Sequence, residues 1–424
     1  MLRKRSHSPP QIATIAEELA EAQDIVGMLA ELPDLWDVNV AAWYNDSVPS
    51  RFAREGAQEP FIDFVRKATT KPVVGVGRFT SPDVMAKMIR QGTLDFIGCA
   101  RPSIADPFLP KKIEEGRFDD IRECIGCNIC VSGDMTQGIS RCTQNTAFME
   151  EWRKGWHPER VHPKGKSESV LIVGAGPAGL EAAHILGKRG YQVTLAEATT
   201  TLGGRVARER TLPGLAAWGR VADYRAYQLS QRPNVQTYFN SALSAEDILG
   251  FGFQNVAIAT GATWRADGVA RMHVEPIPNA GLPVFTPDDL MAGGGPFGGN
   301  VLLYDDDHFY MGSVMAELLV ARGCTVDFVT PAAKVAEWAD NTLEQGTIMR
   351  RLLVLGVEIH LSKAQEAIGA KEITLACTWT GRQSALACDA VVYVTSRFPN
   401  DSLYHQTKAL DWQATGIRTL KLIG

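Results

Sequence analysis

The chain has 424 residues, of which 45% are hydrophobic and 21% are charged, and its net charge is −5. This length predicts two or three domains with large cores, and the weak negative charge disfavours nucleic acid and anionic membrane surfaces as partners. No apolar run approaches the roughly 18 residues that a membrane-spanning helix needs, so neither nucleic acid nor a membrane is predicted as a partner.

Residues 1–118 alternate between helical and strand-like patterns. An acidic amphipathic helix over 12–32 leads into a strand at 35–40, and strands at 72–76 and 94–97 each follow a further helix. Strands joined by helical crossovers form parallel sheets, but about three strands are too few to close a barrel. The acidic first helix is unlike a secretory or mitochondrial targeting segment, so a cytoplasmic protein is expected.

Half of the 8 cysteines lie in one short segment, in the order Cys124-x2-Cys127-x2-Cys130-x11-Cys142. Three thiolates at this spacing can wrap one corner of a cubane, and a fourth from the following loop closes the site, which predicts a 4Fe-4S cluster. Zinc also takes four thiolates, but usually from two separated C-x-x-C pairs. Disulfides within such a run would be strained, and the rest of the chain is poor in cysteine.

The next part opens with a dinucleotide-binding pattern. A strand over 169–173 runs into Gly174-Ala-Gly176-Pro-Ala-Gly179, a helix follows, and Glu197 ends the next strand. The glycines would let backbone N–H groups approach a pyrophosphate, and Glu197 can accept both ribose hydroxyls. A carboxylate at this position favours adenosine without a 2′-phosphate, as in FAD or ADP.

Two later turns are expected around the same nucleotide. One contains Gly204 and Arg205, and the other contains Thr260 and Gly261 at the end of an apolar strand. Both FAD and ADP fit this pattern.

A second unit of the same kind begins with a strand over 301–304, a helix over 312–322 and a strand over 324–329. Its glycine turn is missing, and Asp305-Asp306-Asp307-His308 stands in its place. Three carboxylates repel a pyrophosphate, and their side chains block close approach of the backbone. NAD(P)H is therefore not the expected partner. The alternative is that this loop binds NAD in some other way.

Four motifs together carry a resemblance to a known family. They are Gly75-Val-Gly77-Arg78, the segment Ile97-Gly-Cys-Ala-Arg101-Pro-Ser-Ile-Ala-Asp-Pro-Phe-Leu-Pro110, the cysteine motif ending in Cys142-Thr-Gln-Asn145, and Val173-Gly-Ala-Gly-Pro-Ala-Gly179. In this order they resemble the family of trimethylamine dehydrogenase, histamine dehydrogenase and bacterial N-methyl-amine demethylases. The resemblance implies an FMN-bearing (β/α)8 barrel of the old-yellow-enzyme type, a cluster segment and two nucleotide-binding domains of the glutathione-reductase type.

The resemblance gives the expected fold class and domains. The class is α/β: the C-terminal part of a (β/α)8 TIM barrel, a 4Fe-4S segment, then two Rossmann-like nucleotide-binding domains. The expected domains are residues 1–118 for the barrel units, 119–168 for the cluster segment and linker, 169–295 with 380–424 for the FAD- or ADP-binding domain, and 296–379 for the second nucleotide domain.

The resemblance also implies an FMN-phosphate site, carried over to Gly77, Arg78, Ala100 and Arg101. Phosphate sites of such barrels lie after the last two strands, and the planar fork of Arg101 suits phosphate oxygens. The alternative for the two arginines is an ordinary solvated loop position.

The amine site is implied at two further residues. Asp46 corresponds to the active-site aspartate, and Trp43 to an aromatic residue that holds a methylated ammonium by a cation–π contact. A loop cap for Asp46 and simple packing for Trp43 are the alternatives. Asp134 stands where a second aromatic residue is expected, which favours an N-methylated compound larger or more polar than trimethylamine.

Taken together, the sequence predicts an internal piece of an iron–sulfur flavoprotein that dehydrogenates and demethylates a methylated amine. FMN, a 4Fe-4S cluster and FAD or ADP are the expected cofactors, an electron-transferring flavoprotein is the expected acceptor, and the full-length protein is expected to be a homo-oligomer. The alternatives are an NADPH-dependent 2,4-dienoyl-CoA or enoate reductase and a non-catalytic electron-transfer or nucleotide-binding fragment.

Overall fold

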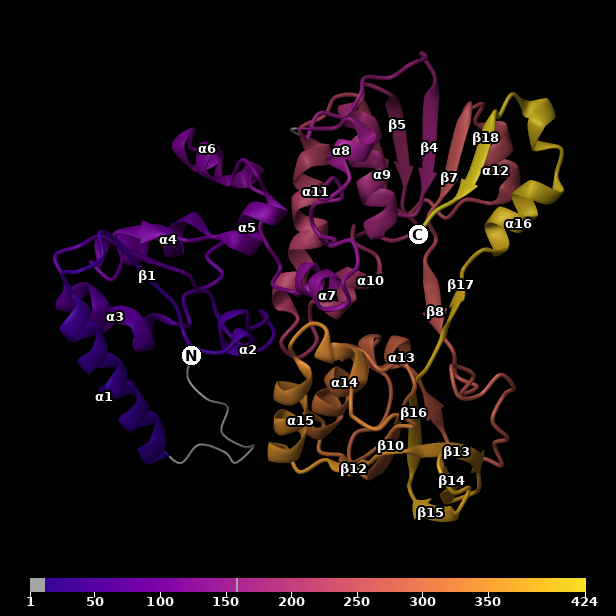
Figure 1. Ribbon diagram of the computed structural model, residues 1–424. Coiled ribbons are helices and arrows are strands. Elements are labelled where there is room, and N and C mark those ends of the chain that lie inside the picture. The colour runs from indigo at the N-terminus through magenta and orange to yellow at the C-terminus, as the bar shows by residue number, and fades with distance from the viewer. Residues whose placement is uncertain (1–11, 158) are drawn as a thin grey trace. The chain divides into compact units, whose positions relative to one another are not determined.

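The computed structural model describes residues 12–157 and 159–424, which form two compact units (Figure 1). The first unit contains the residues up to 48 and residues 53–118, and the second contains residues 49–52 and 119–424. Both units combine helices with largely parallel sheets, so the predicted α/β class is confirmed.

The first unit is built on a parallel sheet in the order β1-β2-β3. Its strands are β1 (Trp36–Val38), β2 (Val73–Gly75) and β3 (Phe96–Ile97), and its helices are α1 (Ile12–Leu29), α2 (Trp43–Asp46), α3 (Glu59–Ala68), α4 (Pro82–Arg90), α5 (Ala100–Ala105) and α6 (Leu109–Glu114). Helix α3 buries Ile62 and Val65, and α4 buries Met85 and Met88. These are the strands predicted from the sequence, joined by helical crossovers.

The second unit begins with the cysteine segment and continues into the first nucleotide domain. The segment contains a 3-10 turn, η1 (Phe118–Asp120), and the helices α7 (Ile129–Met135) and α8 (Glu151–Lys154). The domain has a parallel sheet in the order β18-β7-β4-β5-β6. The strands are β4 (Ser169–Val173), β5 (Gln192–Ala196), β6 (Val235–Tyr238), β7 (Asn255–Ile258) and β18 (Thr419–Leu422).

Helices and short 3-10 turns accompany this sheet. They are α9 (Pro177–Lys188), α10 (Arg205–Glu209), η2 (Ala216–Gly219), α11 (Arg220–Ser230), α12 (Ala245–Gly250), α16 (Ser402–Ala409) and η4 (Trp412–Thr415). Helices α9 and α11 pack against each other, as Figure 1 shows beside β4 and β5. Leu171, Ile172 and Leu195 of the strands are buried between the layers, as expected for a parallel sheet covered on both faces.

The second nucleotide domain has a parallel sheet in the order β12-β11-β10-β16-β9 and a smaller antiparallel sheet, β13-β14-β15. The strands are β9 (Val284–Phe285), β10 (Asn300–Asp305), β11 (Thr325–Val329), β12 (Glu358–His360), β13 (Lys363–Ile368), β14 (Glu372–Cys377), β15 (Gln383–Ala387) and β16 (Ala390–Val394). The helices are α13 (Pro287–Met291), α14 (Tyr310–Ala321), η3 (Glu337–Asp340) and α15 (Gln345–Val354).

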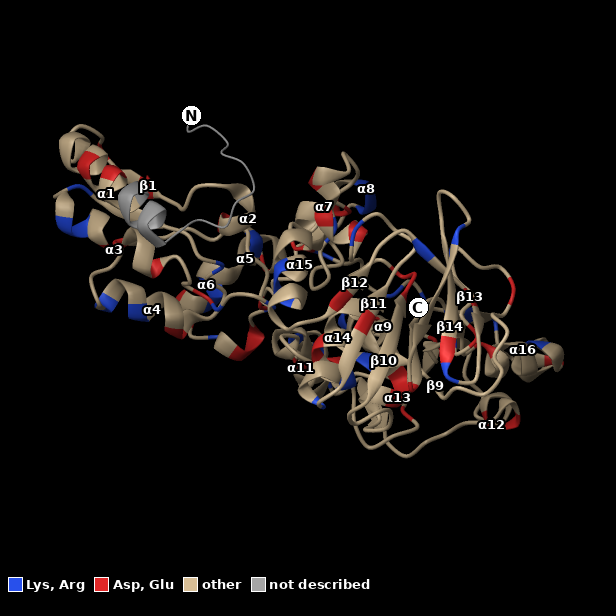
Figure 2. Cartoon of the chain, turned by 90° about the horizontal axis from the view of Figure 1, so that it is seen from below, with Lys and Arg blue, Asp and Glu red and all other residues tan. Residues whose placement is uncertain are grey.

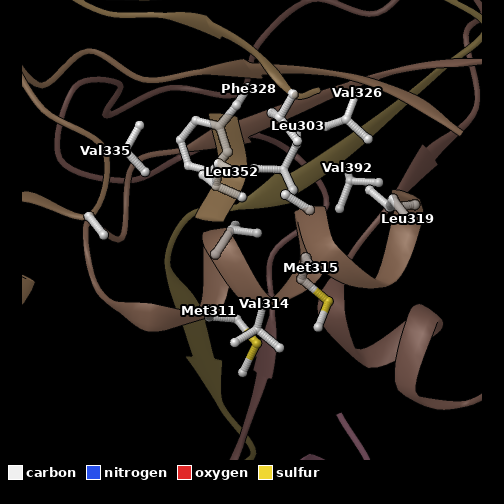
Figure 3. Packing of buried hydrophobic residues seen from close by; sticks show 14 of the residues in the cluster. Leu303, Met311, Val314, Met315, Leu319, Val326, Phe328, Val335, Leu352 and Val392 are labelled. Atoms are coloured by element: carbon white, nitrogen blue, oxygen red, sulfur yellow. The ribbon is translucent and has the colours of Figure 1, made fainter. Parts of the chain in front are cut away.

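The core of this domain lies between the parallel sheet and α14. Figure 3 shows Leu303, Phe328 and Val392 of the strands close to Met315 of α14 and Leu352 of α15. Most residues of α14 between Met311 and Leu319 are buried, because both sides of this helix are covered. The rigid packing fixes the start of α14, where a nicotinamide cofactor would be expected.

The chain returns to the first nucleotide domain later than the expected boundary at residue 380. Strand β16 pairs in parallel with β10, and β15 pairs with β14, so residues 383–394 belong to the sheets of the second domain. The antiparallel pair β8 (Ala262–Trp264) and β17 (Arg397–Pro399) then connects the two domains. All five residues of β16 (Ala390–Val394) are buried. Such a continuous apolar run predicts a central strand but does not say which of the two parallel sheets it joins.

Residues 49–52 belong to the second unit. Within it, the Arg51 side chain is buried against α14. Its guanidinium lies 2.6 Å from the Glu317 carboxylate and donates to Ser313 Oγ at 2.9 Å. Removing either charge would leave the other buried without its partner, which is costly. The sequence contains no signal for this pair.

Charged residues of both signs are interspersed over the helices of each unit (Figure 2). Among the described residues, no helix combines the length and apolar character needed to cross a membrane.

Candidate functional site

The four-cysteine segment curls tightly between Cys124 and the start of α7. Gly126 and Asn128 adopt positive φ angles of 63° and 57°, and the Gly126 N–H lies 3.3 Å from Cys124 Sγ. Backbone N–H groups directed at sulfur are a common feature of iron–sulfur sites. The eight cysteines among the described residues are free thiols, four of them in this segment.

The loop that carries the fourth cysteine returns to this curl. Thr143, directly after Cys142, places its Oγ1 3.2 Å from Cys127 Sγ. Burial raises the pKa of Cys127 to about 12, with smaller contributions from Cys124 and Cys142. Because burial disfavours the Cys127 thiolate, a thiolate at this position requires a compensating cation, which the iron of a cluster would supply.

Within the described residues, no three His, Cys, Asp or Glu side chains are grouped closely enough to ligate a single ion. A cubane places each cysteine at a different iron, so its ligands are spread around the cluster. The curl and the returning loop fit such a cluster, with Cys124, Cys127, Cys130 and Cys142 as the residues that would hold it.

The three glycines before α9 have separate roles. Gly174 has φ +101°, and a Cβ there would lie 2.5 Å from the Ala259 carbonyl oxygen. A Cβ on Gly179 would lie 1.9 Å from the Gly174 carbonyl oxygen, so this position permits close helix–strand packing. Gly176 faces open space, where a pyrophosphate would approach the backbone. Gly204 borders this opening, since a Cβ there would lie 3.0 Å from Gly176 Cα.

The Glu197 side chain accepts a hydrogen bond from the backbone of this turn. Its Oε2 accepts the Ala175 N–H at 2.8 Å, and its Oε1 accepts the Thr199 N–H at 2.9 Å and the Thr199 hydroxyl at 2.8 Å. The carboxylate is buried and is therefore held in one orientation at the end of β5. Ribose recognition by Glu197 stays a prediction, and the structure adds a role in shaping the glycine turn.

The other residues expected around the nucleotide already have protein partners. Arg205 pairs with Asp288 at 3.2 Å and also donates to the Ala262 carbonyl. The Thr260 hydroxyl donates to the Asn400 carbonyl, and the Asn400 N–H donates to the Gly261 carbonyl at 2.8 Å. These contacts fix the turn after β7 close to the loop that precedes α16.

In the first unit, Arg78 and Arg101 both hold the loop after α2. Arg78, with φ +56°, donates to the Ala53 carbonyl at 2.8 Å, and Arg101 donates to the Ser47 carbonyl at 3.1 Å. Ala100 is the first residue of α5, and the Gly77 carbonyl accepts the Gly56 N–H at 2.9 Å. Phosphate binding by the four residues Gly77, Arg78, Ala100 and Arg101 stays a prediction.

Trp43 and Asp46 are brought together on the single turn of α2. The Trp43 side chain is 44% exposed, and the Asp46 carboxylate accepts hydrogen bonds from Gln58 Nε2 and Ser47 Oγ, both at 3.3 Å. Their spacing places both on one side of the turn. Asp134, which stands in place of the second aromatic residue, is exposed on α7.

The carboxylate loop between β10 and α14 is buried rather than solvated. Asp305 Oδ1 accepts the N–H groups of Asp307 and His308, each at 3.2 Å. Asp306 accepts the Met272 N–H at 2.7 Å and lies 2.9 Å from His308 Nε2. Burial raises the pKa of Asp305 to about 7. The chain's own carboxylate therefore occupies the turn that a cofactor pyrophosphate would need.

A pocket of about 940 Å³ in the second unit joins the cluster segment to the first nucleotide domain. Its lining includes Cys142, Pro177 and Ala178 at the start of α9, and the pair Glu209 and Tyr310. The Tyr310 hydroxyl donates to Glu209 at 3.0 Å, and burial raises the pKa of Glu209. Sequence reasoning did not identify this pair, because its members are about a hundred residues apart and neither lies in a motif.

Three family models match the chain. Residues 8–120 match the NADH:flavin oxidoreductase / NADH oxidase family, residues 172–242 match a NAD(P)-binding Rossmann-like domain, and residues 285–385 match an OYE-like second alpha/beta domain.

Dimethylamine dehydrogenase of Hyphomicrobium sp. (strain x) is 40% identical over 423 residues, which cover 92% of this chain and 57% of that protein. The structure of histamine dehydrogenase from Rhizobium sp. 4-9 is 62% identical with a TM-score of 0.93. The structure of 6-hydroxypseudooxynicotine amine oxidase from Pseudomonas geniculata N1 is 51% identical with a TM-score of 0.92. These two structural matches cover 95% of this chain, and 59% and 60% of theirs. The chain belongs to the dimethylamine and histamine dehydrogenase family.

Membership of this family confirms the predicted resemblance and the predicted order of a flavin barrel segment and two nucleotide-binding domains. It also supports the predicted cofactors: FMN, a 4Fe-4S cluster and a nucleotide in the first Rossmann-like domain. The chain spans a little over half the length of these relatives.

Proposed function

We propose that this chain supplies the last barrel units, the cluster and the nucleotide domains of an iron–sulfur flavoprotein amine dehydrogenase. The observation that carries the direction of electron flow is the buried Asp305 carboxylate at the start of α14. With this turn filled, electrons enter from the substrate amine and not from NAD(P)H. This observation disfavours the alternative reductase.

The substrate we propose is an N-methylated amine larger or more polar than trimethylamine. Three relatives are named for oxidation or dehydrogenation of an amine. Trp43 would hold the ammonium by a cation–π contact, worth about 0.5–2 kcal/mol, and Asp46 would orient it. In the sequence, Asp134 replaces an aromatic residue of the family pattern, which favours a more polar amine.

When bound, FMN would supply the acceptor for the hydride that the amine loses, and the amine would become an iminium. The resulting iminium adds water and separates into an aldehyde and the demethylated amine. The residues of this chain would act in three places: Gly77, Arg78, Ala100 and Arg101 at the FMN phosphate, Trp43 and Asp46 at the amine, and the four cysteines at the cluster that passes electrons on singly.

We further propose an electron-transferring flavoprotein as the acceptor, a cytoplasmic location and a homo-oligomeric full-length protein. The cluster supports a protein acceptor, because it passes electrons one at a time and a separate redox partner can receive them singly.

The test is amine-dependent reduction of an artificial electron acceptor by the full-length protein, with amines of increasing size. We expect Trp43→Ala to raise KM for a methylated amine by roughly 10-fold, since about 1.4 kcal/mol of binding would be lost. The neighbouring Tyr44, 61% exposed on the same turn, offers Tyr44→Ala as the control. Equal effects of the two substitutions would remove Trp43 from the site, and no activity with any amine would overturn the proposed function.

A further inference from the structure

Arg225 of α11 is a buried cation that bonds to the cysteine segment and to α9. Only 2% of its surface is exposed. Its Nε donates to Glu181 of α9 at 2.6 Å, and its Nη1 and Nη2 donate to the side-chain and main-chain oxygens of Gln144 at 2.9 and 3.2 Å. This planar fork is a geometry that Lys cannot reproduce.

Gln144 lies two residues after Cys142 and connects the two ends of the cysteine segment. While its Oε1 accepts from Arg225, its Nε2 donates at 3.0 Å to the carbonyl of Glu123, the residue before Cys124. Gln144 is 1% exposed, so these bonds are shielded from water and are costly to leave unmade.

Glu181 connects Arg225 and the Cys142 loop to α9, the helix that follows the glycine turn. Its second oxygen accepts the Thr146 hydroxyl at 2.6 Å, so α9 holds the Cys142 loop at a second point. Glu181 lies in the second turn of α9, just after the glycine turn, and Cys142, Glu181 and Arg225 line the same pocket. One wall is therefore shared by the loop of the fourth cysteine and the start of the nucleotide-binding helix.

We propose that Arg225, Gln144 and Glu181 form a clamp that positions Cys142 and so retains the iron that this cysteine ligates. The clamp residues touch neither iron nor sulfur, so they are positioning residues. Partners that orient metal ligands in this way change metal retention by about 10–100-fold when they are removed. This inference rests on the proposed 4Fe-4S site. Within that site, the three residues hold the loop of Cys142, the fourth cysteine ligand.

The expected consequence of a loosened clamp is selective loss of one iron. Ferricyanide takes one electron from [4Fe-4S]2+, Fe2+ leaves, and [3Fe-4S]+ remains while Cys142 keeps its sulfur as a free thiolate. The product has a characteristic EPR signal. A substitution that only lowered overall stability would release the whole cluster and would not enrich this signal.

The experiment compares anaerobically purified wild-type chain with Arg225→Met, Gln144→Leu and Thr146→Val. The control is Asp223→Asn. Asp223 lies on α11, as Arg225 does, and forms an exposed pair with Arg210. We expect the first two variants to form the three-iron signal at least ~10-fold faster with ferricyanide, Thr146→Val to be intermediate, and the control to match wild type. Calorimetric binding of ADP should be retained in all of them.

Wild-type rates in both Arg225→Met and Gln144→Leu would overturn the clamp, as would loss of ADP binding in parallel with loss of iron. Wild-type protein that contains neither iron nor sulfide would instead refute the cluster itself, and with it the proposed function.

Discussion

Asp305 packs directly against Gly312 on the first turn of α14. A Cβ at position 312 would lie 2.7 Å from the Asp305 Cγ and 3.0 Å from its Cβ. The helix therefore accepts the carboxylate only because residue 312 has no side chain. Glycine thus serves here to admit a side chain of the protein, in the place where a dinucleotide-binding turn uses glycine to admit a phosphate.

Gly312→Ala should destabilise the second nucleotide domain by about 1–3 kcal/mol, because the added methyl group overpacks a rigid buried site. Gly346→Ala in α15 is the matched control, since a Cβ there meets nothing within 4 Å and alanine favours a helix. The measurement is the thermal unfolding temperature of both variants. Gly312→Ala that is as stable as Gly346→Ala would mean that Asp305 is not tightly held.

Asp305→Asn should stabilise the protein at pH 8 and have less effect at pH 6. The folded pKa of about 7 lies above the ordinary value near 4, so the folded state binds this proton more tightly than the unfolded state. Stability is therefore lost as pH rises between these two values, by an amount on the order of 2–4 kcal/mol. Asparagine keeps the oxygen that accepts the Asp307 and His308 N–H groups and carries no charge.

The readout is the difference in unfolding temperature between Asp305→Asn and wild type across pH 6 to 8. A difference that is constant with pH would show that Asp305 does not titrate in this range.

Gly176→Ala should weaken ADP binding while leaving the fold intact. Gly176 has φ −70°, which alanine adopts freely, and a Cβ would meet no protein atom within 4 Å. The methyl group would instead enter the space for the pyrophosphate, and we expect at least ~10-fold weaker binding with stability within about 0.5 kcal/mol of wild type. Titration calorimetry with ADP measures this, with Gly165→Ala in the linker as control. Wild-type affinity in Gly176→Ala would place the nucleotide elsewhere.

The sequence predicted those features that depend on short spacings. Each of these features is encoded by a short stretch of sequence. They are the glycine turn before α9, the strands on either side of it and the carboxylate loop after β10, and the structure contains all three. Burial of Asp305 was not predicted, because three adjacent carboxylates usually lie in water. The contact between Gly312 of α14 and Asp305 is recognised only from the structure.

Long-range contacts were missed for a physical reason. Arg225 meets Gln144 across 81 residues, and Arg51 meets Glu317 across 266. Neither pair belongs to a motif or to a periodic pattern, so the sequence does not indicate that its members are in contact. The boundary at residue 380 was placed too early for the same reason, since the buried run of β16 fits either sheet and only its pairing with β10 assigns it.

The direction of electron flow is the central claim, and anaerobic spectroscopy of the full-length protein tests it most directly. Flavin absorbance is followed after mixing with an N-methylated amine in one sample and with NADPH in another. The buried Asp305 turn predicts rapid bleaching by the amine and unchanged absorbance with NADPH over the same interval. Bleaching by NADPH at a catalytic rate would contradict the account and restore the reductase.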